Sequence, residues 1–385
     1  MGEQDAPVAM APPPEPGGRP AVLTRAPSDH LRAEVAAALH RREDELVVAA
    51  TARVLGAADP EDRADPDPVS EELGREQQRF HLQHLAAALA ADRPQLFAEY
   101  ARWATALLEA RGQTSTGLPR HLDVLTAVIA DHLGPRAGDL VQGVVEEALR
   151  AVAGEPDART SELDPASPHA PLATRYLDAL IAGDRAGAVR LVTQAVAGGM
   201  PLEDLYLDVL APTLREVGRR WQVGEISIAQ EHLATATTQL AIAQLYPQLF
   251  MSPRNGRSIV VASVGGDLHE VGARMLADLF ELRGWESTFL GANTPVEELV
   301  ALVVDTAPDV LAISATLPTH VEQARASIAA LRSAGSDTVV LVGGRPFLQV
   351  ADLWRQVGAD GTAPDARGAV EEATRLLRMK GRWER

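Results

Sequence analysis

A short apolar run followed by a glycine-rich turn constrains this chain more than any other stretch. The run Ser258–Ser263 is rich in β-branched residues, and the turn Gly265–Gly272, with the sequence GGDLHEVG, follows almost at once. Apolar residues then recur at helical spacing, at Val271, Met275, Leu276, Leu279 and Leu282. This order predicts a strand, a turn and a helix. Asp267 and His269 would then lie beyond the carboxyl end of the strand, where ligands bind in open α/β sheets.

The same alternation of strand and helix continues almost to the end of the chain. Strands are expected over 258–263, 286–290, 310–315, 338–342 and 359–362, with helices between them and a closing helix over 370–379. Continuous apolar strands such as Val310–Ile313 suit a parallel sheet that is buried on both faces. Five strands and five helices favour the flavodoxin-like order.

Two helical units precede this α/β domain, which we place at 257–380. Residues 28–153 predict an all-α bundle of five helices, the first running from Ser28 through Leu46 and Val47. Four helices with short connections over 171–250 predict a four-helix cap bundle. The proline-containing stretch 154–170 is expected to be a linker, and the Pro-, Ala- and Gly-rich residues 1–27 a disordered tail.

Composition excludes several classes of function. Lys and Arg number 36 against 53 Asp and Glu, so the net charge of -17 argues against direct nucleic-acid binding. The chain has no cysteine, which excludes disulfides, iron–sulfur clusters and thioether-linked chromophores. We see neither a signal peptide nor an apolar run of membrane-spanning length, so a cytoplasmic protein without membrane contact is expected.

The turn carries a recognisable pattern, Asp267-x-His269-x-x-Gly272. It is the pattern of the cobalamin-binding domain, and the region from Arg257 to Lys380 resembles that family. Imidazole is a suitable axial ligand for cobalt, and a carboxylate two residues earlier can fix its tautomer. The resemblance implies that His269 ligates cobalt and that Asp267, Leu268 and Gly272 contact the cofactor.

Two further stretches match the family at predicted strand ends. Ser314-Ala315-Thr316 ends the third strand, and Gly343-Gly344 ends the fourth. In the family these positions line the slot for the nucleotide tail of cobalamin, which implies tail contacts for Ser314, Thr316, Gly343 and Gly344. The family more often has leucine where Thr316 stands. His320, nearby, is expected to be a surface or pocket-rim residue and not a second ligand.

The cap contains a second signature. Trp221, in the expected third loop, is followed after nine residues by Glu231-His232 in the fourth helix. This is similar to the W-x9-EH signature of CarH-type light sensors, and it implies that these three residues cover the upper, adenosyl ligand of adenosylcobalamin. Two features depart from that branch. A helical bundle replaces the DNA-binding domain, and Gln222 follows the tryptophan where CarH-type receptors can offer a histidine.

The layout also resembles the photocobilins, cobalamin photoreceptors that hold biliverdin as a second chromophore. In the bundle, Phe80 and His84 share one helix face, and Tyr100 and Trp103 share another. These four residues form the candidate biliverdin pocket. Since the chain lacks cysteine, the bilin would be held non-covalently. Alternatively, these residues belong to an ordinary bundle core. The bundle itself would then be a dimerisation or partner-docking module.

Three functions follow from these resemblances. The first is a non-enzymatic light sensor, a homo-oligomer whose assembly depends on light and which signals to an unknown downstream protein. The second is a corrinoid methyl-carrier protein of a methyltransferase system, although Trp221 and Glu231-His232 suit an adenosyl group better than a methyl group. The third is an adaptor that reports cobalamin status in the dark.

Overall fold

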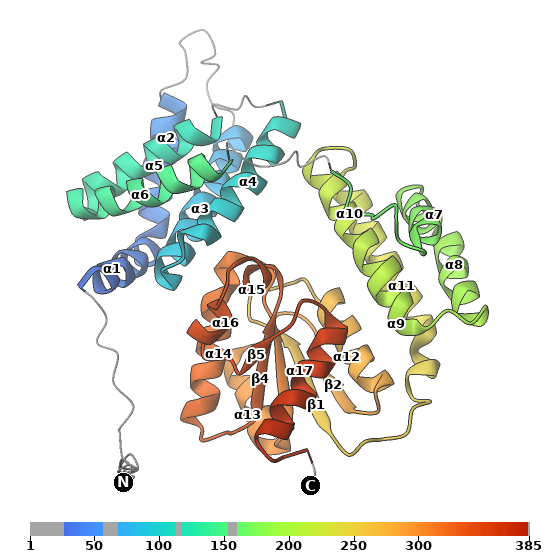
Figure 1. Cartoon of the computed structure of the whole chain (residues 1–385). Helices are drawn as coiled ribbons and strands as arrows, with labels where there is room; N and C mark the ends of the chain where they lie inside the picture. The colour runs from blue at the N-terminus through green and yellow to red at the C-terminus, as the bar shows by residue number, and fades with distance from the viewer. Residues whose placement is uncertain (1–26, 57–67, 113–116, 153–159, 384–385) are drawn as a thin grey trace, which may run out of the picture.

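The computed structural model describes residues 27–56, 68–112, 117–152 and 160–383. The expected tail over 1–27 and the first part of the expected linker lie almost wholly outside these ranges. Figure 1 shows three groups of elements, an N-terminal helical bundle, a second helical unit and an α/β unit, with the bundle above the sheet and the second unit at its upper right. None of the helices within these ranges is both long and apolar enough to cross a membrane.

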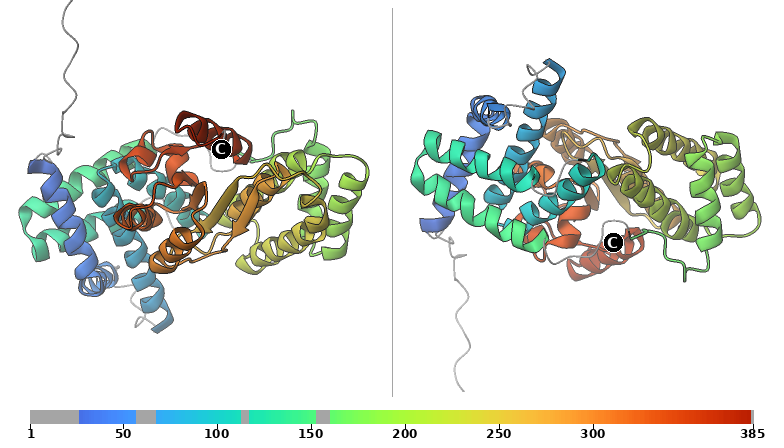
Figure 2. Two further views of the ribbon diagram at one scale, coloured as in Figure 1. Left: turned by 90° about the horizontal axis from the view of Figure 1, so that it is seen from below. Right: turned by 90° about the horizontal axis from the view of Figure 1, so that it is seen from above.

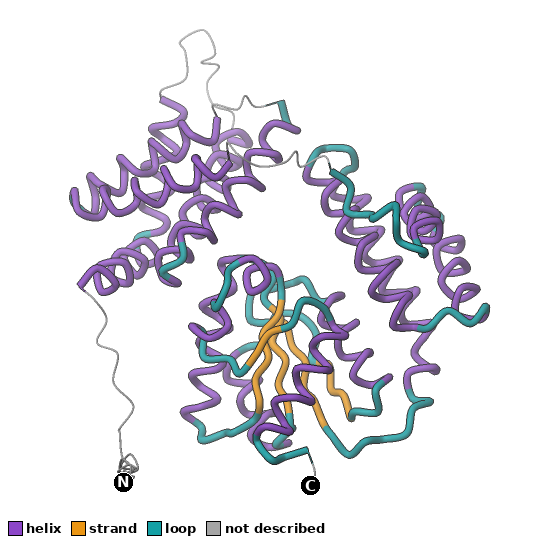
Figure 3. Tube along the Cα trace, in the orientation of Figure 1, coloured by secondary structure: helices purple, strands orange, loops and turns teal. Residues whose placement is uncertain are grey.

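The α/β unit contains a five-stranded parallel sheet with the order β2-β1-β3-β4-β5, which confirms the predicted flavodoxin-like topology. Its strands fan out between helices in Figure 3. The strands are β1 (Ser258–Ser263), β2 (Glu286–Phe289), β3 (Val310–Ser314), β4 (Val339–Gly343) and β5 (Gly361–Thr362). Ser263, Ser314 and Gly343 lie in one register row across the three central strands, at their carboxyl ends.

Helices cover both faces of the sheet, as the apolar strands require. Along β1, Ile259 and Val261 pack with residues of α12 (Val271–Leu282) and α17 (Ala366–Met379). The alternate residues Val260 and Ala262 pack with those of the helices on the other face. These are α13 (Val296–Thr306) and α14 (Val321–Ser333); η2 (Pro318–His320), α15 (Arg345–Gln349) and α16 (Leu353–Gln356) complete the unit.

The cap is a four-helix unit, as predicted. Its elements are α7 (Ala170–Ile181), α8 (Arg185–Ala197), the consecutive α9 (Leu202–Asp204), η1 (Leu205–Leu210) and α10 (Ala211–Gln222), and α11 (Ile228–Leu249). A capping box between Ser227 and Gln230 starts α11. Trp221 lies in the last turn of α10 and not in the following loop. The helix ends just after it, where Gly224 adopts a left-handed conformation with φ +75°.

The N-terminal bundle has six helices in the described residues, one more than predicted. They are α1 (Pro27–Arg41), α2 (Glu43–Gly56), α3 (Pro68–Ala91), α4 (Pro94–Ala110), α5 (Gly117–Leu133) and α6 (Pro135–Val152). The prediction of one helix through Leu46 was wrong because the chain turns at Arg42. The Arg42 guanidinium donates to the carbonyl of His132 at 2.6 Å, a contact with α5 that local sequence does not reveal.

The bundle packs directly on both other units. Its apolar core is continuous with the core on the α13–α14 face of the sheet. The Gln349 amide of α15 donates to Glu99 of α4 at 2.7 Å, and the Gln222 amide of α10 donates to the Trp103 carbonyl of α4 at 3.2 Å. The two views in Figure 2 show the bundle and the cap on opposite sides of the sheet's centre. The space above the carboxyl ends of the strands is therefore bordered by all three units.

Candidate functional site

The turn after β1 holds Asp267 and His269 in a fixed relationship. Gly266 adopts φ +83°, a conformation that glycine accepts without strain, and Asp267 is fully buried. Asp267 Oδ1 accepts hydrogen bonds from His269 Nδ1 at 2.8 Å and from the His269 backbone at 3.0 Å. Asp267 Oδ2 accepts from the backbone of Thr316 at 2.7 Å. One carboxylate thus joins the turn after β1 to the segment after β3.

His269 presents its other ring nitrogen to the space above the sheet. Its side chain is 61% exposed, although Nδ1 is held by Asp267. The hydrogen bond at Nδ1 leaves Nε2 as the nitrogen that can ligate a metal, which is the usual arrangement for a carboxylate-oriented histidine ligand. The Ser263 hydroxyl donates to the His269 carbonyl at 3.0 Å and fixes the backbone from below.

The carboxylate of Asp267 and the imidazole of His269 stabilise each other's charged forms. Burial opposes ionisation of Asp267, but hydrogen bonds from His269 and His320 outweigh it and hold the Asp267 pKa well below its usual range. The same hydrogen bond to Asp267 raises the pKa of His269, and the Glu231 carboxylate of the cap adds to this rise. Glu231 therefore acts electrostatically on the imidazole from the opposite side of the space.

The strand-end residues leave room next to the turn. A Cβ added at Gly343 or at Gly272 would meet no atom within 4 Å, so both glycines border open space. Gly344 is different: its φ is +105°, and a Cβ there would lie 2.0 Å from the Ala315 carbonyl oxygen. Ser314 is half-buried in the same register row as Gly343. The four predicted tail-slot residues thus lie together at the carboxyl ends of β3 and β4, where one of them, Thr316, donates to Asp267.

The cap contributes the upper side of the site through one face of α11. His232 Nδ1 lies 2.6 Å from Glu231 Oε2, and the Thr235 hydroxyl donates to Glu231 Oε1 at 3.0 Å. One turn further, the Gln239 amide donates to Glu270 Oε1 at 2.8 Å and so connects α11 to the turn that carries His269. Glu231 is therefore on the face of α11 that is directed at the sheet, and His232 is hydrogen-bonded to it.

A row of aromatic rings runs from the bundle to the cap. His84 stacks on Tyr100 at a ring-centroid distance of 3.9 Å, and Phe80 lies 6.0 Å from His84. Tyr100 is followed by Trp103 at 6.1 Å, and Trp103 by Trp221 of the cap at 6.2 Å. We call these five residues the aromatic ladder. The structure thus brings together the four predicted bilin-pocket residues and joins them to the predicted upper-ligand tryptophan.

The ladder also approaches the turn with the predicted ligand. Burial, with a smaller contribution from the nearby His320, lowers the pKa of His84 to about 4. The bundle helix α3 packs against η2, which carries His320. The bundle is accordingly a third wall of the site, next to the cap and the sheet.

Three contributors were missed or misjudged from the sequence. His320 was predicted as a surface or rim residue, but its side chain is 12% exposed and its Nδ1 lies 3.3 Å from Asp267 Oδ2. Glu270 and Ser263 were not singled out, although both fix the turn. Their position within or next to the motif was the available signal. That position did not reveal their hydrogen-bond partners, which are Gln239 of the cap for Glu270 and the His269 carbonyl for Ser263.

These features fit a corrinoid held between the cap and the sheet. An oriented imidazole with a free Nε2 faces the space, Leu268 beside it is an apolar side chain that is 75% exposed, and glycines without neighbours flank both. An exposed leucine next to an exposed imidazole is what a flat apolar macrocycle would cover. The fold and the site define a cobalamin-binding protein.

Comparison with known proteins agrees with this class. Two family models, each described as a B12 binding domain, match residues 172–246 and 257–373. A corrinoid protein of Desulfitobacterium hafniense is 30% identical over 206 residues, which are 52% of this chain and 94% of that protein. The chain belongs to the cobalamin (B12)-binding family.

Two other relatives are of different kinds. Dimethylamine corrinoid protein 3 of Methanosarcina acetivorans is 26% identical over 204 residues, 52% of this chain and 94% of that protein. The HTH-type transcriptional repressor CarA of Myxococcus xanthus is 38% identical over 112 residues, 29% of this chain and 37% of the repressor. The similarity to corrinoid proteins therefore covers nearly their whole length, and the similarity to CarA about a third of it.

Proposed function

We propose that this chain is a light sensor that binds adenosylcobalamin, with His269 as the lower axial ligand. Trp221, Glu231 and His232 would cover the upper ligand. Bound adenosylcobalamin would supply a cobalt–carbon bond that light breaks. The observation that carries the proposal is the packing of Trp221 on Trp103, since it joins the upper side of the site directly to the N-terminal bundle.

The residues of this chain have separate tasks in the proposal. Asp267 orients the imidazole and favours its Nε2 for cobalt, and Ser314, Thr316, Gly343 and Gly344 accommodate the nucleotide tail. On the cap, Glu231 offers carboxylate oxygens as hydrogen-bond acceptors for the hydroxyls of an adenosyl group. An upper ligand that contacts Trp221 stabilises one arrangement of cap and bundle, and its loss releases that arrangement.

We further propose the aromatic ladder as the contact surface for a non-covalent biliverdin. Phe80, which is 47% exposed, and the half-buried Trp103 offer ring area to a conjugated ligand, and the buried His84 and Tyr100 connect them. Tyr100→Leu should then lower biliverdin uptake by the full chain, measured by absorption titration. Tyr246→Leu, a substitution of an exposed tyrosine on α11, is the matched control and should bind biliverdin like the wild type.

A corrinoid methyl carrier is the second candidate, and the comparisons favour it. The matched relatives include proteins named corrinoid and dimethylamine corrinoid proteins, and the chain spans 94% of each. The bundle argues in the other direction. A methyl carrier has to expose its cobalt to a separate enzyme, whereas here α4 packs against α10 at the edge of the cap.

One experiment separates these functions. The full chain is loaded with adenosylcobalamin in the dark, exposed to green light, and followed by absorption spectroscopy and size-exclusion chromatography. A light sensor changes its spectrum and its assembly, and Trp221→Ala retains cobalamin but loses the change in assembly. An unchanged spectrum and oligomer would contradict the light sensor and leave the methyl carrier. A change in assembly on dark titration alone would instead indicate an adaptor that reports cobalamin status.

A further inference from the structure

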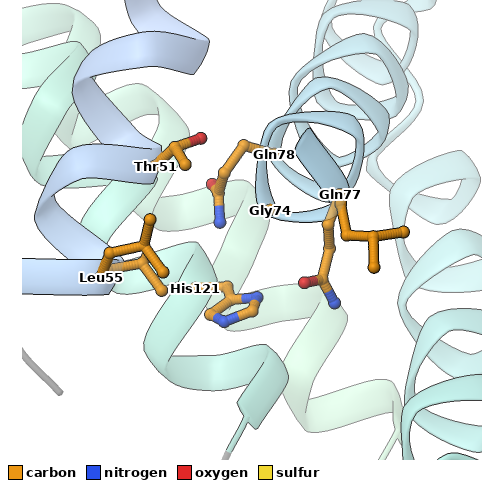
Figure 4. Close-up of a pocket in the computed structure, with 8 residues that line it drawn as sticks. Thr51, Leu55, Gly74, Gln77, Gln78 and His121 are labelled. Carbon is orange, nitrogen blue, oxygen red and sulfur yellow. The ribbon is translucent and has the colours of Figure 1, made fainter. Parts of the chain in front are cut away.

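The N-terminal bundle contains a cavity that the cobalamin site does not use. It has a volume of about 390 Å³ and lies between α2, α3 and α5. This is within the range of small-molecule sites, about 300–1,000 Å³. Figure 4 shows the carboxamides of Gln77 and Gln78 and the ring of His121 directed into the space, with Leu55 at its edge. The cavity is therefore large enough for a small organic ligand.

Several buried polar atoms at this cavity have no hydrogen-bond partner among the described residues. They are Thr51 Oγ1, Gln78 Oε1, His121 Nδ1 and, on the ring behind His121, His81 Nε2. Thr51 is 3% exposed, and Gln78 and His81 are 1% exposed. Leaving such an atom unpaired is unfavourable, because burial removes its hydrogen bonds to water without replacing them. Three of these atoms belong to residues that line the cavity, and the fourth lies on the ring behind His121. Unpaired atoms gathered in this way from three helices indicate a site that is completed by something it binds.

The lining defines the chemistry of that ligand. Among the described residues that line the cavity none is acidic, lysine or arginine, and Val54, Leu55 and Leu73 give it an apolar side. Burial lowers the pKa of His121 and lowers that of His81 to about 3, so both rings are neutral near pH 7. Thr51 and Gln78 can each donate as well as accept. The described lining gives a charged ligand no counter-charge, whereas an uncharged ligand with a polar and an apolar part would match both sides.

We propose that this cavity is a second small-molecule site, for an uncharged organic ligand that carries a hydrogen-bond donor and acceptor next to an apolar ring. The site is separate from the proposed bilin surface, because the cavity lies on the His121 side of His81 and the aromatic ladder on its Tyr100 side. His81 Nδ1 lies 2.6 Å from the Tyr100 hydroxyl, and its ring lies 5.7 Å from that of His121.

The test uses the full chain without cobalamin and in the dark, so it does not depend on the proposed light sensing. The probe is 4-phenylimidazole, whose azole has a donor and an acceptor and whose phenyl ring is apolar. Calorimetric titration at pH 8, where the probe is uncharged, should give one saturable site. Gln78→Met and Thr51→Val, which keep side-chain volume but remove polar atoms, should each weaken binding at least tenfold. Gln142→Met on α6, outside the cavity, should bind like the wild type.

Thermal unfolding provides the second measurement. Because Gln78→Met removes an unpaired buried polar group, its unfolding midpoint without probe should not fall below that of the wild type. The probe should raise the midpoint of the wild type but not that of Gln78→Met. Equal affinity of the probe for both proteins would place it elsewhere and overturn the site. Absence of binding to the wild type would overturn the ligand class and indicate that water alone fills the cavity.

Discussion

The indole of Trp103 in the N-terminal bundle lies 6.2 Å from the indole of Trp221 in the cap, with an angle of 38° between their planes. The two residues are far apart in the sequence, in α4 and in α10, yet they are in contact where the bundle meets the cap. Gln222 strengthens this contact by donating to the Trp103 carbonyl at 3.2 Å. Any ligand that rests on Trp221 is therefore one ring away from the bundle.

The first prediction concerns this pair. Aromatic pairs contribute about 0.5–1.5 kcal/mol beyond the area they bury. Trp103→Ala and Trp221→Ala should consequently be non-additive, with a coupling of about 1 kcal/mol in the free energy of cobalamin binding when adenosylcobalamin is titrated. Trp383→Ala, on the α12–α17 face of the sheet, is the control and should be additive with either. Additive effects of Trp103→Ala and Trp221→Ala would mean that the contact between the two rings does not couple cobalamin binding to the bundle.

The second prediction concerns the lower ligand. His269→Ala should abolish the absorption features of histidine-ligated cobalamin and weaken its binding. Asp267→Asn should retain the imidazole but weaken binding about 10–100-fold, the usual effect of losing an orienting carboxylate. The measurement is an absorption titration with hydroxocobalamin. His232→Ala, which removes the histidine on the cap, should leave the ligated spectrum intact. A normal spectrum for His269→Ala would assign the ligand to another residue.

The third prediction separates binding from folding at two neighbouring glycines. Gly344→Ala should destabilise the α/β unit by several degrees in unfolding midpoint, because the new Cβ would lie 2.0 Å from the Ala315 oxygen at a φ of +105°. Gly343→Ala meets no atom and should fold normally, yet it places a methyl group in the expected tail slot. It should therefore lower cobalamin affinity at unchanged stability. Wild-type affinity of Gly343→Ala would locate the tail elsewhere.

The fourth prediction concerns pH and the contact between cap and sheet. Asp278 on α12 accepts a hydrogen bond from the Tyr206 hydroxyl of the cap at 2.9 Å. Burial raises the Asp278 pKa to about 6; the Tyr206 hydrogen bond and Arg274 oppose this rise, and Glu281 adds to it. The unfolded carboxyl has a pKa of about 3.9. Between these values the folded chain holds a proton that the unfolded chain has lost.

The free energy of unfolding should thus fall as pH rises from about 4 to 6, with a loss of up to about 2–3 kcal/mol from this group. Asp278→Asn cannot titrate and should lack this contribution. The difference in unfolding midpoint, variant minus wild type, should accordingly increase between pH 4.5 and pH 7. Taking this difference cancels the other carboxylates. A difference that does not change with pH would show that Asp278 is ionised throughout in the folded protein.

Local pattern was sufficient for much of the fold and for the lower half of the site. Continuous apolar strands predicted a parallel sheet, because strands buried on both faces need them, and the alternation of five strands with helices predicted the strand order. The spacing of Asp267 and His269 predicted their pairing, since both belong to one turn and their geometry is local. Ser227 and Gly224 similarly mark the ends of the cap helices.

The sequence by itself determined the elements of the α/β unit, the sheet order and the oriented imidazole. Only the tertiary structure decided that the bundle forms a third wall, that His320 lies beside Asp267, and that α1 and α2 separate at Arg42. The physical reason is the same in each case. These features depend on contacts between residues far apart in the chain, and the amphipathic pattern of a helix specifies that one face is buried without specifying what covers it.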